Sequence, residues 1–265
     1  MAVALAPPLP PGDEEQDAIP APALIAATAW TNRRRPIPRA IVSAACSVSE
    51  VLFIDGVFPH PISEILPARN ASRTWTSLAD VLDALWTAAT RHPFLDAVRD
   101  GTIADEAFDR WLSQDALFVA DLLVFQARLL ARAPRTAQGV LAGGCVALVD
   151  ELDWFEDQAV RRGIGPGRQP LPATIAYHRL LQRLDGLEVD AALTALWVIE
   201  RVYLLAWSSA VSSTSPFREF VDHWTTEGFA AYVDGLGELA NPDAHGELVA
   251  EVLRHEVAFW EMALA

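Results

Sequence analysis

Four acidic residues in this sequence are each followed, three positions later, by an aromatic residue. The pairs are Asp115 with Phe118, Glu151 with Trp154, Glu200 with Tyr203, and Glu256 with Phe259. In a helix, residues with this spacing share one face, so each acid would point the same way as its ring. Four such pairs in one interior would stack a flat ring and hydrogen-bond its polar edge. A single pair is better explained by ordinary helix packing, and only the four together predict a binding site.

The stretch from Leu193 to Trp207, LTALWVIERVYLLAW, is apolar almost all the way round. This pattern predicts a helix at the centre of a helical domain. Glu200 lies within it, and a buried carboxylate is costly unless it is hydrogen-bonded or paired. Tyr203 and Trp207 follow on the same face. An acid, a phenol and an indole are therefore expected to point together into the neighbouring helices.

Acid–base work by carboxylates is the chemistry that these residues favour. Asp115, Glu200 and Glu256 all fall on apolar helix faces beside aromatic residues. Crowded and partly desolvated carboxylates have pKa values that are pushed apart, which provides one base and one acid.

Cysteine and metal chemistry are less well supported by the sequence. Cys145 has no histidine three or four residues away, as is typical of an inert core thiol. His178, His223 and His255 fall on separate expected helices, and no Glu-x-x-His motif of a di-iron site is present. We therefore expect neither a metal nor another cofactor.

The composition excludes several functional classes. The chain has 265 residues, of which 52% are hydrophobic, and a formal net charge of -15. This charge argues against nucleic acid or an anionic membrane as a partner, because both require a basic patch. The absence of lysine excludes a lysine Schiff base and a Walker-type phosphate loop. Two cysteines and no apolar run of membrane-spanning length fit a cytoplasmic protein.

Proline divides the chain into two parts. Most of the 18 prolines lie in residues 1–76, which predicts a disordered or weakly ordered extension with one short strand over Val51 to Phe58. Residues 77–265 are expected to form an all-α domain of about seven to eight helices. The expected helices run from Ser77 to Arg91, Phe94 to Asp100, Asp105 to Arg132, Arg135 to Arg162, Ala173 to Leu184, Val189 to Ser212, Pro216 to Leu239, and His245 to Leu264.

Two separated motifs carry a family resemblance. The stretch HPFLDAVRDGTIADEAFDRWLSQDALF, from His92 to Phe118, and the C-terminal EVAFWEMA, from Glu256 to Ala263, resemble the TenA family (thiaminase II). Tyr177 after LPAT and the helix LWVIERVYLLAW fit between them in the right order. The resemblance covers residues 77–265.

The resemblance implies a haem-oxygenase-like helical bundle without haem, assembled as a homo-oligomer, a dimer or a tetramer. It implies hydrolysis of a small-molecule aminopyrimidine, by deamination or deformylation, in thiamin salvage. By position, Asp115 would hold the pyrimidine's ring nitrogen and amino group, and Glu256 would be the proton shuttle. The side chains expected to pack on the ring are Phe118, Tyr177, Trp224 and Phe259, with Tyr203 and Trp207 beside them.

The chain departs from the family pattern at the nucleophile. Many members carry a cysteine on the helix that here reads ALTALWVIE, and this chain has none there. It therefore looks like the branch with an active-site glutamate, for which Glu200 is the first candidate and Glu151 the second. The resulting hypothesis makes Glu200 the base or nucleophile and Glu256 the proton donor.

Two other classes of function remain open from the sequence. One is a non-catalytic ligand-binding or regulatory helical protein, although the acidic composition opposes DNA binding. The other is a metal-dependent oxidase of the same fold.

Overall fold

The computed structural model describes residues 77–165, 167 and 169–265. The expectations for residues 1–76, including the strand over Val51 to Phe58, lie outside this part of the chain. No strand occurs within the described residues, so the prediction of an all-α domain is confirmed. No helix among them is long and apolar enough to span a membrane.

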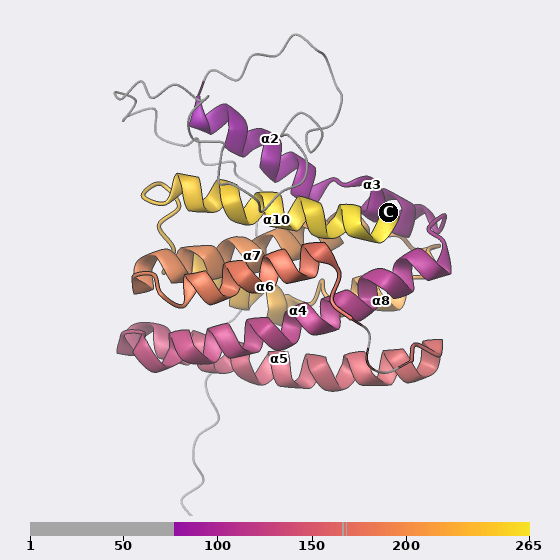
Figure 1. Cartoon of the computed structure of the whole chain (residues 1–265), viewed down its shortest axis with the longest axis horizontal. Helices are drawn as coiled ribbons and strands as arrows, with labels where there is room; N and C mark the ends of the chain where they lie inside the picture. Colours follow the sequence, from indigo (N-terminus) through magenta and orange to yellow (C-terminus); the bar gives the residue numbers. More distant parts are fainter. Residues whose placement is uncertain (1–76, 166, 168) are drawn as a thin grey trace, which may run out of the picture. The chain divides into compact units, whose positions relative to one another are not determined.

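The described residues form an antiparallel bundle of helices (Figure 1). In chain order the helices are α2 (Leu78–Thr90), α3 (Pro93–Asp100), α4 (Asp105–Arg132), α5 (Arg135–Arg162), α6 (Pro172–Leu184), α7 (Val189–Ser209), α8 (Arg218–His223), α9 (Glu227–Gly237) and α10 (Gly246–Leu264).

Local signals explain several helix ends. The Ser77 hydroxyl accepts a hydrogen bond from the Asp80 amide at 3.2 Å and caps α2. Pro93 stands in the first turn of α3, where its missing amide proton costs nothing, and His92 Nδ1 caps that helix by accepting from the Phe94 amide. Gly101, with a φ of 68°, ends α3 in the left-handed conformation that favours glycine.

The prediction of one helix is wrong. The segment from Pro216 to Leu239 forms two helices, α8 and α9, and not one. The break lies at Trp224, whose indole Nε1 donates to Glu151 on α5 at 2.7 Å. Thr226 then starts α9, because its hydroxyl accepts from the Phe229 amide at 3.1 Å. The amphipathic period continues across this break, so periodicity alone could not reveal it.

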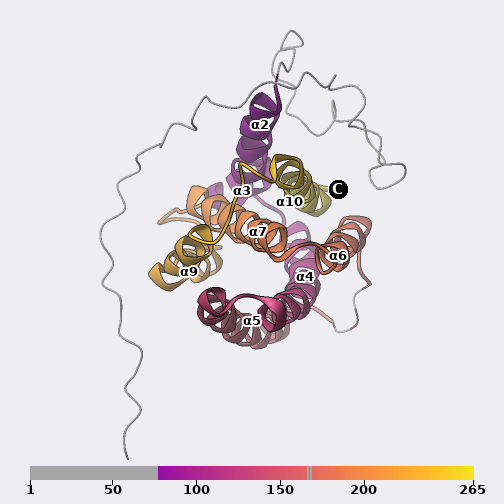
Figure 2. The same cartoon turned by 90° about the vertical axis from the view of Figure 1, so that its left-hand side faces the viewer.

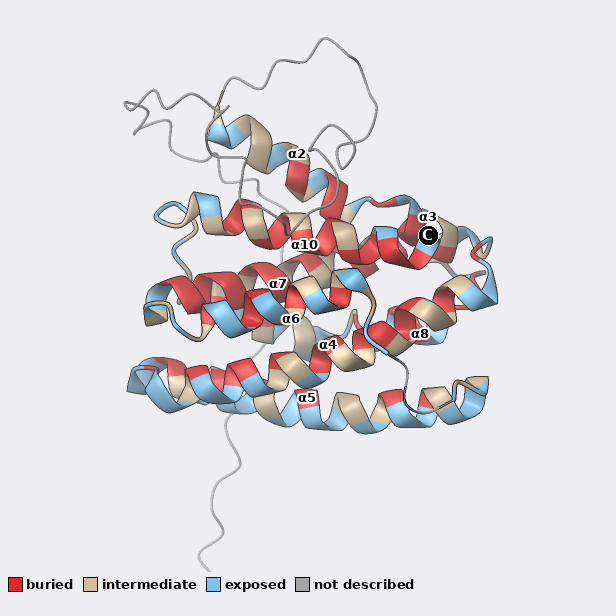
Figure 3. Ribbon diagram, viewed as in Figure 1, coloured by how far each residue is buried: buried red, intermediate tan, exposed pale blue. Residues whose placement is uncertain are grey.

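Helix α7 lies at the centre of the bundle. It packs against α2, α3, α4, α6, α9 and α10, and Figure 2 shows these helices around it end-on. Most of its residues are buried, as Figure 3 shows, whereas α5 exposes one long face. This position fits the expectation drawn from a segment that is apolar on nearly every side.

An aromatic cluster fills one end of the core. Trp111, Trp207 and Trp260 are almost fully buried, with the Trp111 and Trp207 ring centroids 5.1 Å apart. The Trp260 indole donates to the Ala89 carbonyl at 2.9 Å and ties α10 to α2. Tyr203 packs on this cluster, with its ring centroid 6.0 Å from that of Trp207 and 6.2 Å from that of Trp260.

The break between α8 and α9 yields a stability prediction. Thr226→Ala removes the cap of α9 and should lower the free energy of unfolding by about 1 kcal/mol, the usual contribution of a helix N-cap. Thr87→Ala is the control, because the exposed Thr87 hydroxyl bonds to the Asp83 carbonyl within α2 and caps no helix. Urea denaturation of both variants measures the difference. An equal loss in the two variants would contradict the capping role.

Candidate active site

Four carboxylates from four helices converge in the interior. Asp115 comes from α4, Glu151 from α5, Glu200 from α7 and Glu256 from α10. Asp115, Glu200 and Glu256 expose 1%, 6% and 4% of their surfaces. Asp115 lies within electrostatic range of Glu151 and Glu256, and Glu200 within range of the same two residues. The four predicted acids therefore lie close enough together to affect one another's ionisation.

Each carboxylate contacts an aromatic side chain from a different helix. The Tyr203 hydroxyl donates to Asp115 Oδ2 at 2.5 Å, and the Tyr177 hydroxyl donates to Glu256 Oε1. Trp224 Nε1 donates to Glu151 Oε1 at 2.7 Å. These hydrogen bonds link α4 to α7, α6 to α10, and α5 to the residue that follows α8.

The fourth carboxylate, Glu200, has its Oε1 3.4 Å from the Tyr232 hydroxyl of α9. The sequence correctly predicted aromatic rings beside the acids. It paired each acid with a ring on its own helix, however, whereas the hydrogen bonds run between helices.

Burial dominates the electrostatics of the cluster. It raises the pKa of Glu151 to about 7 and that of Glu256 to about 8, and hydrogen bonds from Trp224 and Tyr177 only partly offset this effect. Burial and the nearby Glu151 raise the pKa of Glu200 to about 8. Burial also raises the pKa of Asp115 well above its usual range. Such perturbed carboxylates are typical of acid–base sites.

Three rings gather near Glu256. Phe118, Tyr177 and Phe259 are buried, and the ring centroid of Phe118 lies 4.5 Å from that of Tyr177 and 5.7 Å from that of Phe259. On the other side, the rings of Trp207 and Trp224 are 4.5 Å apart, and Tyr203 packs at 5.6 Å from Trp224. The structure thus brings together all the ring residues predicted for the site. Their roles in binding stay predictions.

Trp154 also packs on this group. Its ring centroid lies 5.2 Å from that of Trp224, and its ring stacks on His223 with the centroids 3.9 Å apart.

Asp115 leaves one acceptor free. Its Oδ1 atom is buried and has no hydrogen-bond partner among the described residues, whereas its Oδ2 accepts from Tyr203. An unpaired buried acceptor is costly, on the order of 1–3 kcal/mol. A bound molecule with an N–H group would remove this cost.

Sequence reasoning missed Tyr232, Gln126 and Gly144. The Tyr232 hydroxyl bonds to Gln126 Oε1 at 3.0 Å, and Gln126 Nε2 donates to the Leu141 carbonyl at 2.9 Å. Gly144 lies directly against this pair, since a Cβ there would be 2.1 Å from Gln126 Nε2. Two features of the sequence could have indicated them: Gln126 lies on the apolar face of α4, and Gly144 lies in the middle of α5.

Cys145 lies beside the cluster without entering its hydrogen bonds. It is a free, partly buried cysteine within electrostatic range of Tyr232. Burial raises the pKa of its thiol, which lowers the fraction present as the nucleophilic thiolate. These facts favour a structural role for Cys145.

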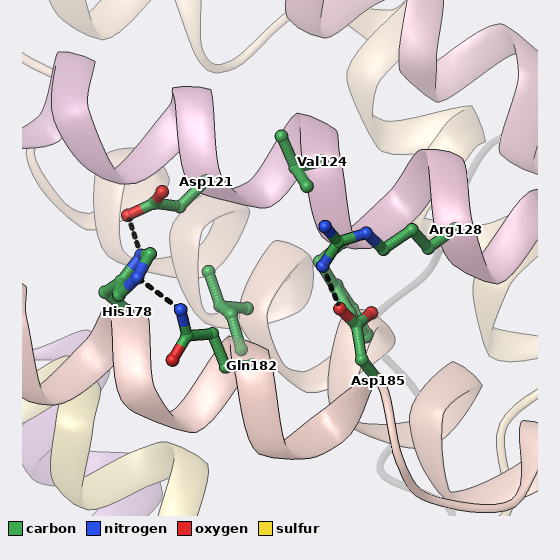
Figure 4. A pocket seen from close by; sticks show the side chains of 8 residues that line it. Asp121, Val124, Arg128, His178, Gln182 and Asp185 are labelled. Carbon is green, nitrogen blue, oxygen red and sulfur yellow. Dashed lines mark hydrogen bonds and ion pairs between the residues drawn. The ribbon is translucent and has the colours of Figure 1, made fainter.

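A separate hollow lies on the outer face between α4 and α6 (Figure 4). Its volume is about 240 Å³, and two ion pairs cross it: His178 with Asp121 at 2.7 Å and Arg128 with Asp185 at 2.6 Å. Its charged groups pair with one another, and only Asp185 Oδ1 among them is buried without a hydrogen-bond partner. No group of three His, Cys, Asp or Glu side chains in the described part of the chain is arranged to hold a metal ion.

The fold and these side chains define an all-α protein with a carboxylate-lined, aromatic interior. Residues 79–265 match the model of the TENA/THI-4/PQQC family. The chain belongs to this family, which confirms the resemblance seen in the sequence.

Two relatives extend this finding. A soybean protein named as a probable bifunctional TENA-E protein is 35% identical over 201 residues, which cover 68% of this chain and 88% of the relative. An aminopyrimidine aminohydrolase from Halalkalibacterium halodurans is 24% identical over 219 residues, covering 71% of this chain and 93% of the relative.

Solved structures share the fold. A TenA homologue from Pyrococcus furiosus superimposes with a TM-score of 0.65 and 28% identity, over 71% of this chain and all of the other. A TenA-like thiaminase homologue from Sulfolobus solfataricus, at 18% identity, has a TM-score of 0.62 over 71% of this chain and 93% of its own.

The raised pKa values link stability to pH. A carboxyl group with a pKa raised by folding contributes stability that is present below the unfolded-state pKa, near 4.5, and is lost as the pH rises towards its folded value, about 8 for Glu200. Glu200→Gln cannot ionise, so its melting temperature relative to the wild type should increase between about pH 5 and pH 8.5. Differential scanning calorimetry across this range measures the effect. The exposed Glu156→Gln on α5 is the control and should show no such trend. A difference between Glu200→Gln and the wild type that is constant with pH would contradict the shift.

Proposed function

We propose that this protein is a hydrolase that cleaves a C–N bond of an aminopyrimidine, by deamination or deformylation, in thiamin salvage. The observation that carries the proposal is the buried, unpartnered Oδ1 of Asp115, placed among aromatic rings and three further carboxylates. The relative from Halalkalibacterium halodurans, named as an aminopyrimidine aminohydrolase, supports the same class of substrate.

Asp115 suits the polar edge of an aminopyrimidine. Its Oδ1 can accept from the amino group, while Tyr203 holds Oδ2 and fixes the orientation of the carboxyl group. The raised pKa of Asp115 allows the carboxyl to share a proton with a ring nitrogen. Phe118, Tyr177 and Phe259 supply flat apolar surfaces for stacking.

C–N hydrolysis needs a base for water and an acid for the departing nitrogen. Glu200 and Glu256 are suited to these tasks, because burial brings the pKa of each to about 8, close to neutral pH. One of them takes a proton from water and the other gives a proton to the leaving group.

Asp115→Asn tests the binding role. The variant keeps the shape but replaces an acceptor by a donor, so kcat/KM should fall on the order of 10²-fold, the scale of leaving a buried polar group without its hydrogen bond. Thiamin, an aminopyrimidine and a formylaminopyrimidine form the substrate panel, and ammonia and formate release are measured. Asp121→Asn on the outer face of α4 is the matched control and should retain activity. Wild-type kinetics for Asp115→Asn would remove this residue from the site.

Glu200→Gln and Glu256→Gln test the acid–base roles. Each should lower kcat by about 10²-fold or more. The double variant should be little worse than the poorer single variant, because the two groups act as a unit. Cys145→Ala should remain active. An inactive Cys145→Ala together with a normal Glu200→Gln would reverse the assignment. Thermal shift with these ligands but no turnover would instead favour a ligand-binding protein. A bound metal found by elemental analysis of the purified protein would favour an oxidase.

The proposal includes a homo-oligomer, a dimer or a tetramer, in the cytoplasm. Analytical ultracentrifugation of the full chain determines the number of subunits.

A further inference from the structure

A series of three hydrogen bonds leads to Glu200. It begins at the Leu141 carbonyl of α5, passes through Gln126 of α4 and the Tyr232 hydroxyl of α9, and reaches Glu200 Oε1 on α7. The successive distances are 2.9, 3.0 and 3.4 Å. Gln126 is fully buried, and both the NH₂ group and the oxygen of its side-chain amide take part in these hydrogen bonds.

The direction of each hydrogen bond is fixed from the Leu141 end. A backbone carbonyl can only accept, so the NH₂ group of Gln126 must face Leu141. The amide oxygen of Gln126 then faces Tyr232 and also can only accept. The single hydroxyl proton of Tyr232 is therefore directed to Gln126, its closer neighbour.

This direction constrains Glu200. With its proton committed to Gln126, the Tyr232 oxygen presents only lone pairs to Glu200. An ionised Glu200 would place a negative oxygen against these lone pairs, whereas a protonated Glu200 can donate to them. We propose that Tyr232 and Gln126 are positioning residues that hold Glu200 as the protonated carboxyl group of the resting site.

The other three carboxylates face a different kind of partner. Glu151 accepts from the Trp224 indole, which is only a donor. Asp115 and Glu256 accept from the hydroxyls of Tyr203 and Tyr177. Glu200 is thus the carboxylate of the cluster whose aromatic neighbour has its proton directed elsewhere.

The groups around Glu200 support the same protonation state. Glu151 on α5 and Glu256 on α10 are carboxylates, and Tyr177 on α6 and Tyr232 on α9 are phenols. None of these side chains carries positive charge. Burial, and next the charge of Glu151, raise the pKa of Glu200 to about 8.

Gly144 makes room for the chain of hydrogen bonds. A Cβ at this position would lie 2.1 Å from Gln126 Nε2 and 2.6 Å from the Tyr232 hydroxyl, which is closer than packing allows. At the adjacent Gly143, a Cβ would meet nothing within 4 Å. The two glycines lie within the same helix, so they form a matched pair for a test.

A protonated Glu200 would be the general acid of the reaction and Glu256 the general base, an assignment that rests on the proposed function. Glu256 in its ionised form, which the hydrogen bond from the Tyr177 hydroxyl stabilises, takes one proton from water, and the resulting hydroxide oxygen bonds to the carbon that carries the departing nitrogen. Glu200 gives its proton to that nitrogen as the C–N bond breaks, which releases ammonia. Transfer of the proton from Glu256 to Glu200 restores the resting site. This order reverses the roles expected from the family resemblance.

Infrared spectroscopy of the free protein tests the proton on Glu200 without any substrate. The carbonyl band of a protonated carboxyl group, present in the wild type near neutral pH and absent from Glu200→Gln, should disappear on titration to alkaline pH. In Tyr232→Phe, Glu200 loses its acceptor. In Gln126→Met, the Tyr232 proton becomes free to stabilise the ionised Glu200. In both variants the band should therefore disappear at a pH about one unit lower than in the wild type. The loss of one net hydrogen bond to a carboxyl group corresponds to about one pKa unit.

The opposite outcomes would overturn the inference. If Tyr232 donates to an ionised Glu200, Tyr232→Phe should retain the band to higher pH, and Gln126→Met should not change it. The absence of a band that depends on Glu200 in the wild type would also overturn it. Because no substrate takes part, these outcomes are independent of whether the protein hydrolyses an aminopyrimidine.

The glycine pair tests the same chain through activity. Gly144→Ala displaces the Gln126–Tyr232 pair, so the alkaline limb of its kcat profile should move about one pH unit lower, again the scale of one hydrogen bond. Gly143→Ala should keep the wild-type profile, although both variants gain helix propensity. Equal profiles for the two variants, with the infrared band of Gly144→Ala unchanged, would contradict the positioning role.

Discussion

Placing four carboxylates in one interior, three of them buried and Glu151 partly buried, is the constraint on which the rest of this structure depends. A charged group taken out of water is costly unless protein groups replace its hydration. Here the replacement comes from phenol and indole groups that approach from neighbouring helices, such as Tyr203 at Asp115 and Trp224 at Glu151. Because each bond joins two helices, the acids also fix how the helices pack. The hydrogen bonds that stabilise the acidic interior therefore also hold the helices of the bundle together.

The central position of α7 follows from this constraint. Glu200 and Tyr203 lie one turn apart on it, and they contact α9 and α4 respectively. A helix with only one polar face could not reach both neighbours and still pack against α2 and α10. The apolar surface of α7 supplies the packing, and its few polar side chains reach inward to form the cluster.

The sequence allowed the helices to be predicted well where local breakers mark their ends. Pro134 separates α4 from α5, and Gly163 ends α5 in the left-handed conformation. The break at Trp224 was missed because a contact with Glu151, distant in the sequence, accompanies it. For the same reason the acids were found but their partners were not. Spacing along one helix says nothing about which ring a second helix brings, so Tyr232 on α9 could not be predicted.

Aromatic donors also decide what the carboxylates can do. An arginine beside a carboxylate favours the ionised form and lowers its pKa. Hydrogen bonds from phenol and indole groups only partly offset the effect of burial, so the pKa values of Glu151 and Glu256 stay near 7 and 8. Carboxyl groups with such values exchange protons readily at neutral pH. Tyrosine and tryptophan beside the carboxylates therefore leave their pKa values near neutral, as a site that both takes and gives protons requires. Arginine, the basic residue that this lysine-free chain uses throughout, would lower those pKa values.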